Sequence, residues 1–134
     1  MTFYLLGLGS NIQPDQHLSA AIDQLTELGE VMMVSEAVET APVGDDFDRP
    51  FVNQLLLLRS SLVAPQLKFR LQQLEINLGR EPKTPARKFK DRTIDIDILH
   101  KAGDANSCLL ATLEDSYNRS IQQRWLRQLA QPHG

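Results

Sequence analysis

Two acidic residues separated by one position, Asp95 and Asp97, are the feature of this sequence with the clearest chemical meaning. They alternate with Ile94, Ile96 and Ile98. Side chains of a strand point to alternate faces, so the isoleucines are predicted to share one face and the aspartates the other. Two neighbouring carboxylates repel each other unless a cation lies between them. The pattern therefore indicates either a divalent-metal site or a half-exposed strand with a solvated acidic face.

Positive charge is concentrated directly before this strand. Six of the 14 Lys and Arg residues lie there, namely Arg80, Lys83, Arg87, Lys88, Lys90 and Arg92. A basic loop beside paired acids suits the binding of a metal–polyphosphate. The net charge of −3 argues against non-specific nucleic-acid binding, so the predicted partner is a compact anionic ligand.

Length and composition indicate a single domain over residues 1–134. The hydrophobic share of 42% and the charged share of 23% are ordinary for globular proteins. The single cysteine, Cys108, fits a reducing compartment, and we expect a buried or incidental thiol rather than a nucleophile. We expect neither a signal peptide nor a membrane helix, and therefore a cytoplasmic protein.

The hydrophobic pattern predicts the element order β-α-β-β-α-β. Strands are expected at positions 3–8, 31–40 and 51–60, and around the two aspartates. Helices are expected to begin at Pro14 and Pro65 and to stop at Gly29 and Gly79. This order is typical of the α+β class. It predicts a ferredoxin-like βαββαβ sandwich, an antiparallel sheet with helices packed on one face.

Beyond the acidic strand, a turn is expected over positions 102–107. A short C-terminal helix follows, with Ser116 or Asn118 as its N-cap. Its apolar stripe would consist of Ile121, Trp125 and Leu129. Core packing is the expected role of that stripe.

Five motifs follow one another at characteristic spacings. They are LGLGSN at 6–11, TAPVG at 40–44, PFVN at 50–53, LEINLGR at 74–80 and DRTIDIDIL at 91–99. Together they resemble the hydroxymethyl-dihydropterin pyrophosphokinase family of folate biosynthesis, over residues 3 to about 100. The resemblance implies transfer of the terminal diphosphate of ATP to the hydroxymethyl group of the reduced pterin, with release of AMP.

The resemblance also implies two Mg²⁺ ions, held by Asp95 and Asp97, that bridge the phosphates. Magnesium prefers one or two carboxylates completed by phosphate oxygens and water, so two acids suffice. Arg80 and Arg92 match catalytic phosphate-binding arginines, whose planar fork suits a phosphate. On the residues alone, Arg80 is a cation at a helix end and Arg92 is a partner of Asp91.

Pterin binding is implied for five positions. The ring of Phe51 would stack on the pterin, and the amide of Asn53 would offer its edge both a donor and an acceptor. The backbone around Thr40, Pro42 and Val43 would complete the pocket. On the residues alone, Asn53 is a turn or strand-start residue and Phe51 is a core residue.

Nucleotide binding is implied for a second group of residues. These are Gln72, Glu75, Lys83, Arg87, Arg92 and Ile98. Gln72 and Glu75 are expected on the polar side of the second helix, where Glu75 could equally be a solvated surface residue. The resemblance makes ATP the co-substrate and the reduced pterin the second small-molecule partner.

The C-terminal region departs from the family because it lacks a Pro-His motif, and we expect it to be divergent and shortened. Arg119 or Arg124, with Trp125, could replace the missing contacts. Two hypotheses therefore stay open: an active pyrophosphokinase, and a paralogue that binds pterin or nucleotide with little or no turnover. We expect no membrane or nucleic-acid partner. A monomer is expected, or a weak homodimer if the apolar run 55–58 lies at a sheet edge.

Overall fold

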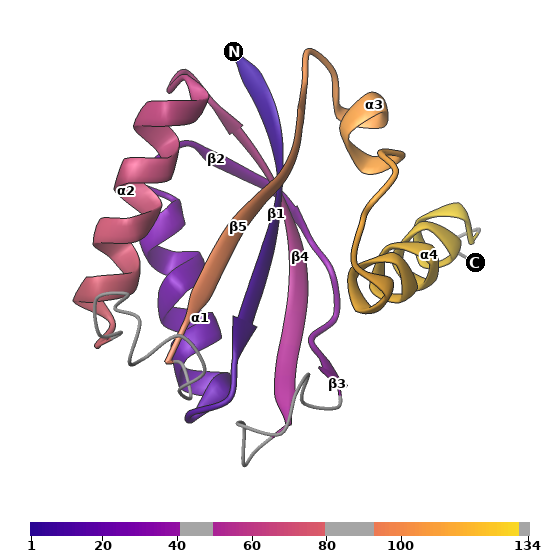
Figure 1. Cartoon of the computed structure of the whole chain (residues 1–134). Coiled ribbons are helices and arrows are strands. Elements are labelled where there is room, and N and C mark those ends of the chain that lie inside the picture. The colour runs from indigo at the N-terminus through magenta and orange to yellow at the C-terminus, as the bar shows by residue number, and fades with distance from the viewer. Residues whose placement is uncertain (41–49, 80–92, 132–134) are drawn as a thin grey trace.

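The computed structural model describes residues 1–40, 50–79 and 93–131 and has three layers (Figure 1). Its strands are β1 (Thr2–Ser10), β2 (Glu30–Val34), β3 (Val38–Thr40), β4 (Phe51–Ser60) and β5 (Asp95–Ala102). Its helices are α1 (Pro14–Leu25), α2 (Ala64–Asn77), α3 (Ala105–Leu109) and α4 (Ser116–Ala130). Within these residues, no helix combines the length and apolar character that crossing a membrane requires.

The sheet has the strand order β2-β4-β1-β5, with β3 also paired to β4, and every pairing is antiparallel. Strand β4 lies between β1 and β2, and β1 lies between β4 and β5, as a split βαβ arrangement requires. The ferredoxin-like prediction is confirmed.

The run Leu55–Leu58 is fully buried in the central strand β4, so the alternative that it lies at an edge and pairs with a second chain is wrong.

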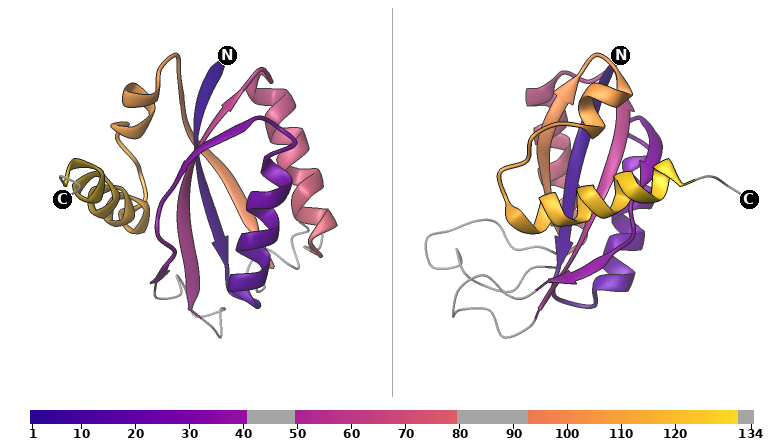
Figure 2. Two further views of the ribbon diagram at one scale, coloured as in Figure 1. Left: turned by 180° about the vertical axis from the view of Figure 1, so that it is seen from behind. Right: turned by 90° about the vertical axis from the view of Figure 1, so that its right-hand side faces the viewer.

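Two helical layers enclose this sheet. Helices α1 and α2 cover one face, as predicted, while α3 and α4 lie against the other (Figure 2). The first core lies under α1 and α2 and includes Tyr4, Leu6, Leu8, Leu25, Leu56, Leu58, Leu67, Leu71, Ile94 and Ile96. The second core lies under α3 and α4 and includes Leu5, Leu55, Leu57, Cys108, Ile121 and Trp125. Alternate residues of β1 and β4 thus supply both cores.

The predicted strand over 31–40 is divided into β2 and β3. Ser35, which follows β2, donates its backbone N–H to the carbonyl oxygen of Leu55 over 2.9 Å. Its hydroxyl oxygen also accepts the N–H of Leu55 over 2.8 Å. The regular ladder is interrupted because one residue supplies both partners of Leu55.

The two predicted helix starts and one helix end agree with the structure. Pro14 opens α1, and Pro65 lies in the first turn of α2. Gly79 follows α2 with a φ of 93°, a left-handed conformation that only glycine adopts without strain. Helix α1 ends earlier than expected, at Leu25, and a turn leads on to Gly29.

The C-terminal region contains more helix than predicted. Instead of the turn over 102–107, α3 begins after Asp104, whose carboxylate accepts the N–H and the hydroxyl of Ser107 over 2.8 and 2.7 Å. Helix α4 has 15 residues and is longer than the short helix predicted. It buries Ile121 and Trp125 as expected. Leu129, in contrast, is 43% exposed and does not belong to the buried stripe.

Cys108 lies in the second core and is fully buried. Burial raises the pKa of its thiol to about 11, because the charged thiolate is poorly solvated there. The prediction of a buried thiol is confirmed, and the raised pKa makes it a poor nucleophile.

Glu75 holds the start of β5 against α2. Its side chain is only 7% exposed, and its Oε2 atom accepts the backbone N–H of Ile96 over 2.7 Å. The expectation that Glu75 lies on the polar side of the second helix, or is solvated, is therefore wrong. Ile96 lies between the two predicted metal ligands, so this bond fixes the backbone that carries them.

Replacing Glu75 with Ala should destabilise the fold by about 2–3 kcal/mol, since the buried N–H of Ile96 would lose a strong acceptor. Glu75→Gln keeps an acceptor oxygen at the same position and should cost clearly less. Urea unfolding monitored by circular dichroism measures both losses, with the exposed Glu27→Ala as the control. Equal losses in the Ala and Gln variants would contradict the role given to this hydrogen bond.

Candidate active site

Asp95 and Asp97 lie on the face of β5 opposite to the first core. Ile94 and Ile96 are buried under α2, while Asp95 is half-buried and Asp97 is exposed. The predicted alternation of acidic and apolar faces is confirmed. Both carboxylates therefore project from the same side of an edge strand, the side on which α3 and α4 also lie.

The sheet register places a second polar group beside this acid pair. Asp95 is paired with Gly9 of β1, and Gly9 is paired on its other side with Asn53 of β4. Directly paired residues share a face, so Asp95, Gly9 and Asn53 form one row across the sheet. Neighbouring strands are about 4.8 Å apart, which separates the Cα atoms of Asp95 and Asn53 by about 10 Å.

Three of the predicted pterin-binding residues lie together at the end of this row. The side-chain amide of Asn53 donates through Nδ2 to the hydroxyl oxygen of Thr40 over 2.6 Å. That hydroxyl in turn donates to the carbonyl oxygen of Phe51 over 3.4 Å. Asn53 is only 9% exposed, and Phe51 is half-buried. The amide is thus held in one orientation beside an aromatic ring.

Tyr117, in the first turn of α4, is a candidate site residue that the sequence reasoning missed. Its hydroxyl donates to Oδ2 of Asp115 over 3.2 Å. Burial, then the charge and hydrogen bond of Asp115, and then the charges of Asp97 and Asp95 raise its pKa to about 12. Its phenol therefore stays protonated and lies within the electrostatic reach of the acid pair. Helix α4 crosses the strands with this first turn on the side of β5 (Figure 2).

The sequence model of the 7,8-dihydro-6-hydroxymethylpterin-pyrophosphokinase family matches residues 5–133. The chain belongs to this family. The match extends well beyond residue 100, so it includes the C-terminal helices that carry no motif of the predicted resemblance. The predicted family is confirmed, and with it an enzyme of the diphosphotransferase type.

Curated relatives agree with this assignment. A 2-amino-4-hydroxy-6-hydroxymethyldihydropteridine pyrophosphokinase of Porphyromonas gingivalis is 40% identical over 102 residues, which cover 74% of this chain and 69% of the relative. The enzyme of the same name from Aquifex aeolicus is 32% identical over 100 residues, covering 74% and 61%. That of Haemophilus influenzae is 28% identical over 121 residues, covering 87% and 74%.

Several pyrophosphokinase residues predicted from the sequence lie outside the described residues. These are Pro42, Val43, Arg80, Lys83, Arg87 and Arg92. Of the other predicted nucleotide contacts, Gln72 is exposed on α2, as expected. Ile98 packs its side chain against the first core, so only its backbone is left as a possible nucleotide contact.

Two of the three candidates for replacing the missing C-terminal contacts, Arg119 and Trp125, have structural contacts, while Arg124 is exposed on α4. Arg119 donates through Nη1 to the carbonyl oxygens of Leu113 and Glu114, which holds the segment before α4 in place. Trp125 is 4% exposed and fills the second core. Trp125 is therefore not available as a substitute pterin contact, whereas Arg119 and Arg124 stay candidates for a phosphate contact. Tyr117 is instead the residue of α4 that the fold brings toward the acid pair. In the sequence, the only sign of this role is that Tyr117 lies at the start of the predicted C-terminal helix.

The donor set at Asp95 and Asp97 fits magnesium. Among residues 1–40, 50–79 and 93–131, no group of three His, Cys, Asp or Glu side chains could hold a metal ion by itself. Magnesium is commonly held by one or two carboxylates, and substrate phosphates and water complete its shell. Two carboxylates on one strand face are therefore a ligand set for a metal that arrives with a polyphosphate.

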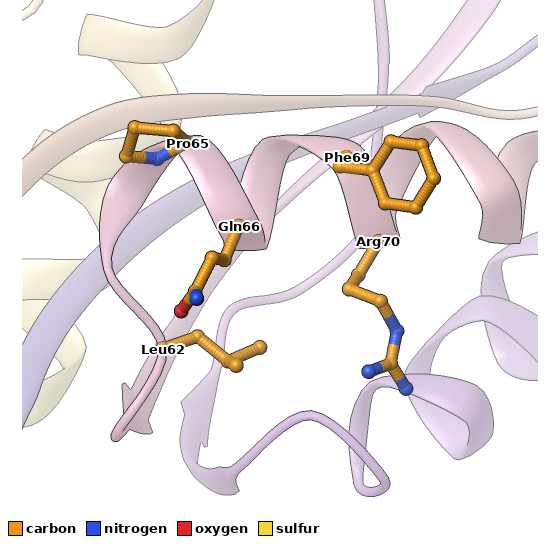
Figure 3. A pocket seen from close by; sticks show the side chains of 5 residues that line it. All are labelled: Leu62, Pro65, Gln66, Phe69 and Arg70. Carbon is orange, nitrogen blue, oxygen red and sulfur yellow. The ribbon is translucent and has the colours of Figure 1, made fainter.

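A hollow of about 440 Å³ lies elsewhere, at the start of α2 (Figure 3). It is lined by Leu62, Pro65, Gln66, Phe69 and Arg70. Helix α2 covers the opposite sheet face from Asp95 and Asn53, so this hollow is separate from the candidate active site.

Asp97→Asn removes one of the charges that raise the pKa of Tyr117, so this pKa should fall from about 12 toward its ordinary value. The ¹³Cζ resonance of Tyr117, followed from pH about 9 to about 12, measures the change. Asp23→Asn on the exposed surface of α1 is the control and should leave the pKa unchanged. An unshifted pKa in Asp97→Asn would contradict the proximity of Tyr117 to the acid pair.

The same raised pKa predicts a pH dependence of stability. The folded chain binds the phenolic proton more tightly than the unfolded chain does, so Tyr117 stabilises the fold below pH about 10. This contribution should disappear as the pH rises through the folded pKa of about 12. Wild type should therefore lose stability relative to Tyr117→Phe as the pH rises from about 10 to about 12, and paired urea-unfolding midpoints at neutral and high pH measure this loss.

Proposed function

We propose that this chain transfers diphosphate from ATP to the hydroxymethyl group of 6-hydroxymethyl-7,8-dihydropterin, releasing AMP, in a reaction that depends on two Mg²⁺ ions. Family membership supports the reaction type and ATP as the co-substrate. The row Asp95–Gly9–Asn53 is the observation that carries the proposal for this chain's own residues.

This row joins the two halves that such a reaction needs. Asn53, held by Thr40, offers the pterin edge a donor and an acceptor, and Phe51 offers a ring face. The acid pair lies on the same face, about two strand spacings away. A pterin bound at Asn53 would therefore present its hydroxymethyl group toward phosphates bound near Asp95.

Positioning and electrostatics would provide most of the rate. Asp95 and Asp97 would hold magnesium, which neutralises charge on the attacked phosphate and on the leaving oxygen. Arg80 and Arg92 are the proposed phosphate-binding arginines. The phenol of Tyr117 donates its one proton to Asp115 and cannot act as a base near neutral pH.

The proposed nucleotide contacts are Gln72, Lys83, Arg87 and the backbone of Ile98, with Pro42 and Val43 on the pterin side. For Glu75 the contact with Ile96 supports a structural role instead. We further propose one cytoplasmic domain that acts on small molecules as a monomer. The burial of the apolar run of β4 inside the sheet supports a monomer. The buried, unpaired Cys108 supports a reducing compartment.

Incubation of the chain with ATP, Mg²⁺ and the reduced pterin should yield AMP and the pterin diphosphate, and chelation of the metal should stop the reaction. The alternative is a paralogue that binds pterin or nucleotide without turnover. Titration calorimetry separates the two, because that alternative requires binding of the ligands in the absence of AMP formation. Failure to bind either ligand would refute both functions.

Asp97→Ala should lower the turnover rate by about a thousandfold, since metal-assisted charge stabilisation is worth several kcal/mol. Asp97 is exposed, so the fold should survive the substitution. Chromatographic quantification of AMP measures the loss. The matched control is Asp23→Ala, an exposed aspartate on α1 that should keep the wild-type rate. Near-normal turnover in Asp97→Ala would exclude this residue as a metal ligand.

A further inference from the structure

Gly9 occupies the middle of the row that joins the acid pair to the pterin-reading amide. It is buried in β1, with Asn53 as its partner on one side and Asp95 on the other. The backbone of Gly9 is ordinary extended strand, so conformational freedom does not explain a glycine here. A glycine is instead required because there is no room for a side chain above its Cα atom.

That space is taken by the carboxamide of Asn53. A Cβ atom built on Gly9 would lie 2.8 Å from Oδ1 of Asn53, closer than real Cβ contacts. It would also lie 3.9 Å from Cδ1 of Phe51, an ordinary contact. A methyl group at position 9 would therefore displace the amide while leaving the ring undisturbed.

The amide has little freedom to move away. Its Nδ2 atom is bonded to Thr40 over 2.6 Å, and the side chain is only 9% exposed. A shift that relieves the contact with position 9 would turn the amide away from its present orientation. Hydrogen bonds weaken steeply with distance and misalignment, so the pterin edge would lose its partners.

We propose that Gly9 is a positioning residue for the pterin: its missing side chain leaves the space in which the Asn53 amide takes the orientation that reads the ligand. This inference rests on the proposed function. It assigns substrate affinity to a strand residue that itself offers the ligand no functional group. It also distinguishes Gly9 from Gly7 on the same strand face, where the atoms nearest to a Cβ atom belong to the flexible side chain of Leu99, from 3.0 Å.

Gly9→Ala should raise the KM and the dissociation constant for the reduced pterin about tenfold, as expected for weakening one hydrogen bond of a buried amide. The KM for ATP and the turnover number at saturating pterin should stay near the wild-type values, because the loss is in pterin binding alone. A general disturbance of the strand would change all of these constants together. Gly7→Ala is the matched control, and its pterin affinity should remain that of wild type.

A double-mutant cycle with Asn53→Ala tests the mechanism. Removing the carboxamide removes the steric conflict, so Gly9→Ala should add no further loss of pterin affinity in the Asn53→Ala background. If Gly9→Ala alone fails to fold, Asn53→Ala should restore a cooperative thermal transition. An unfolded double variant would overturn the proposal, because the glycine would then be required by something other than the amide.

The outcomes separate this inference from the function on which it rests. Normal pterin affinity in folded Gly9→Ala, with an active wild type, would overturn the inference and leave the proposed function intact. Additive losses in the double-mutant cycle would do the same. A wild-type chain that binds no pterin would overturn both.

Discussion

The hydrogen bond from the backbone N–H of Ile96 to the buried carboxyl group of Glu75 ties the strand that carries the acid pair to helix α2. Strand β5 is an edge strand and is paired only with β1. A slip of one residue would turn Asp95 and Asp97 into the core and the isoleucines out of it. The hydrogen bond to Glu75 opposes such a slip, and so does the burial of the Ile96 side chain. The position of the acid pair thus depends on a contact between β5 and helix α2.

One face of the sheet carries both a core and a site. Toward one end of that face, Leu5 and Leu57 are buried under α3 and α4. Toward the other end, Gly9 of β1 lies between Asn53 of β4 and Asp95 of β5. Helix α4 links the two regions, because Trp125 anchors it in the core while Tyr117 lies near the acids. Core packing on this face therefore positions part of the site.

Local patterns predicted the elements whose side chains repeat with a clear period. The alternation around Asp95 gave the strand and its two faces, and Pro14 and Gly79 marked helix ends. The pattern was insufficient where a single side chain redirects the backbone. Ser35 divides one expected strand into two, and Asp104 begins a helix where a turn was expected. Such side chain–backbone hydrogen bonds compete with regular structure and depend on partners that hydropathy does not reveal.

The sequence by itself determined the family, the fold class and the two acids, because these follow from residue order, spacing and strand periodicity. Only the tertiary structure decided which residues act together. It aligned Asp95, Gly9 and Asn53 through strand register, buried Glu75 under Ile96 and brought Tyr117 toward the acid pair. These contacts join segments far apart in the chain. They arise from pairing and packing between elements, which no local pattern of residues specifies.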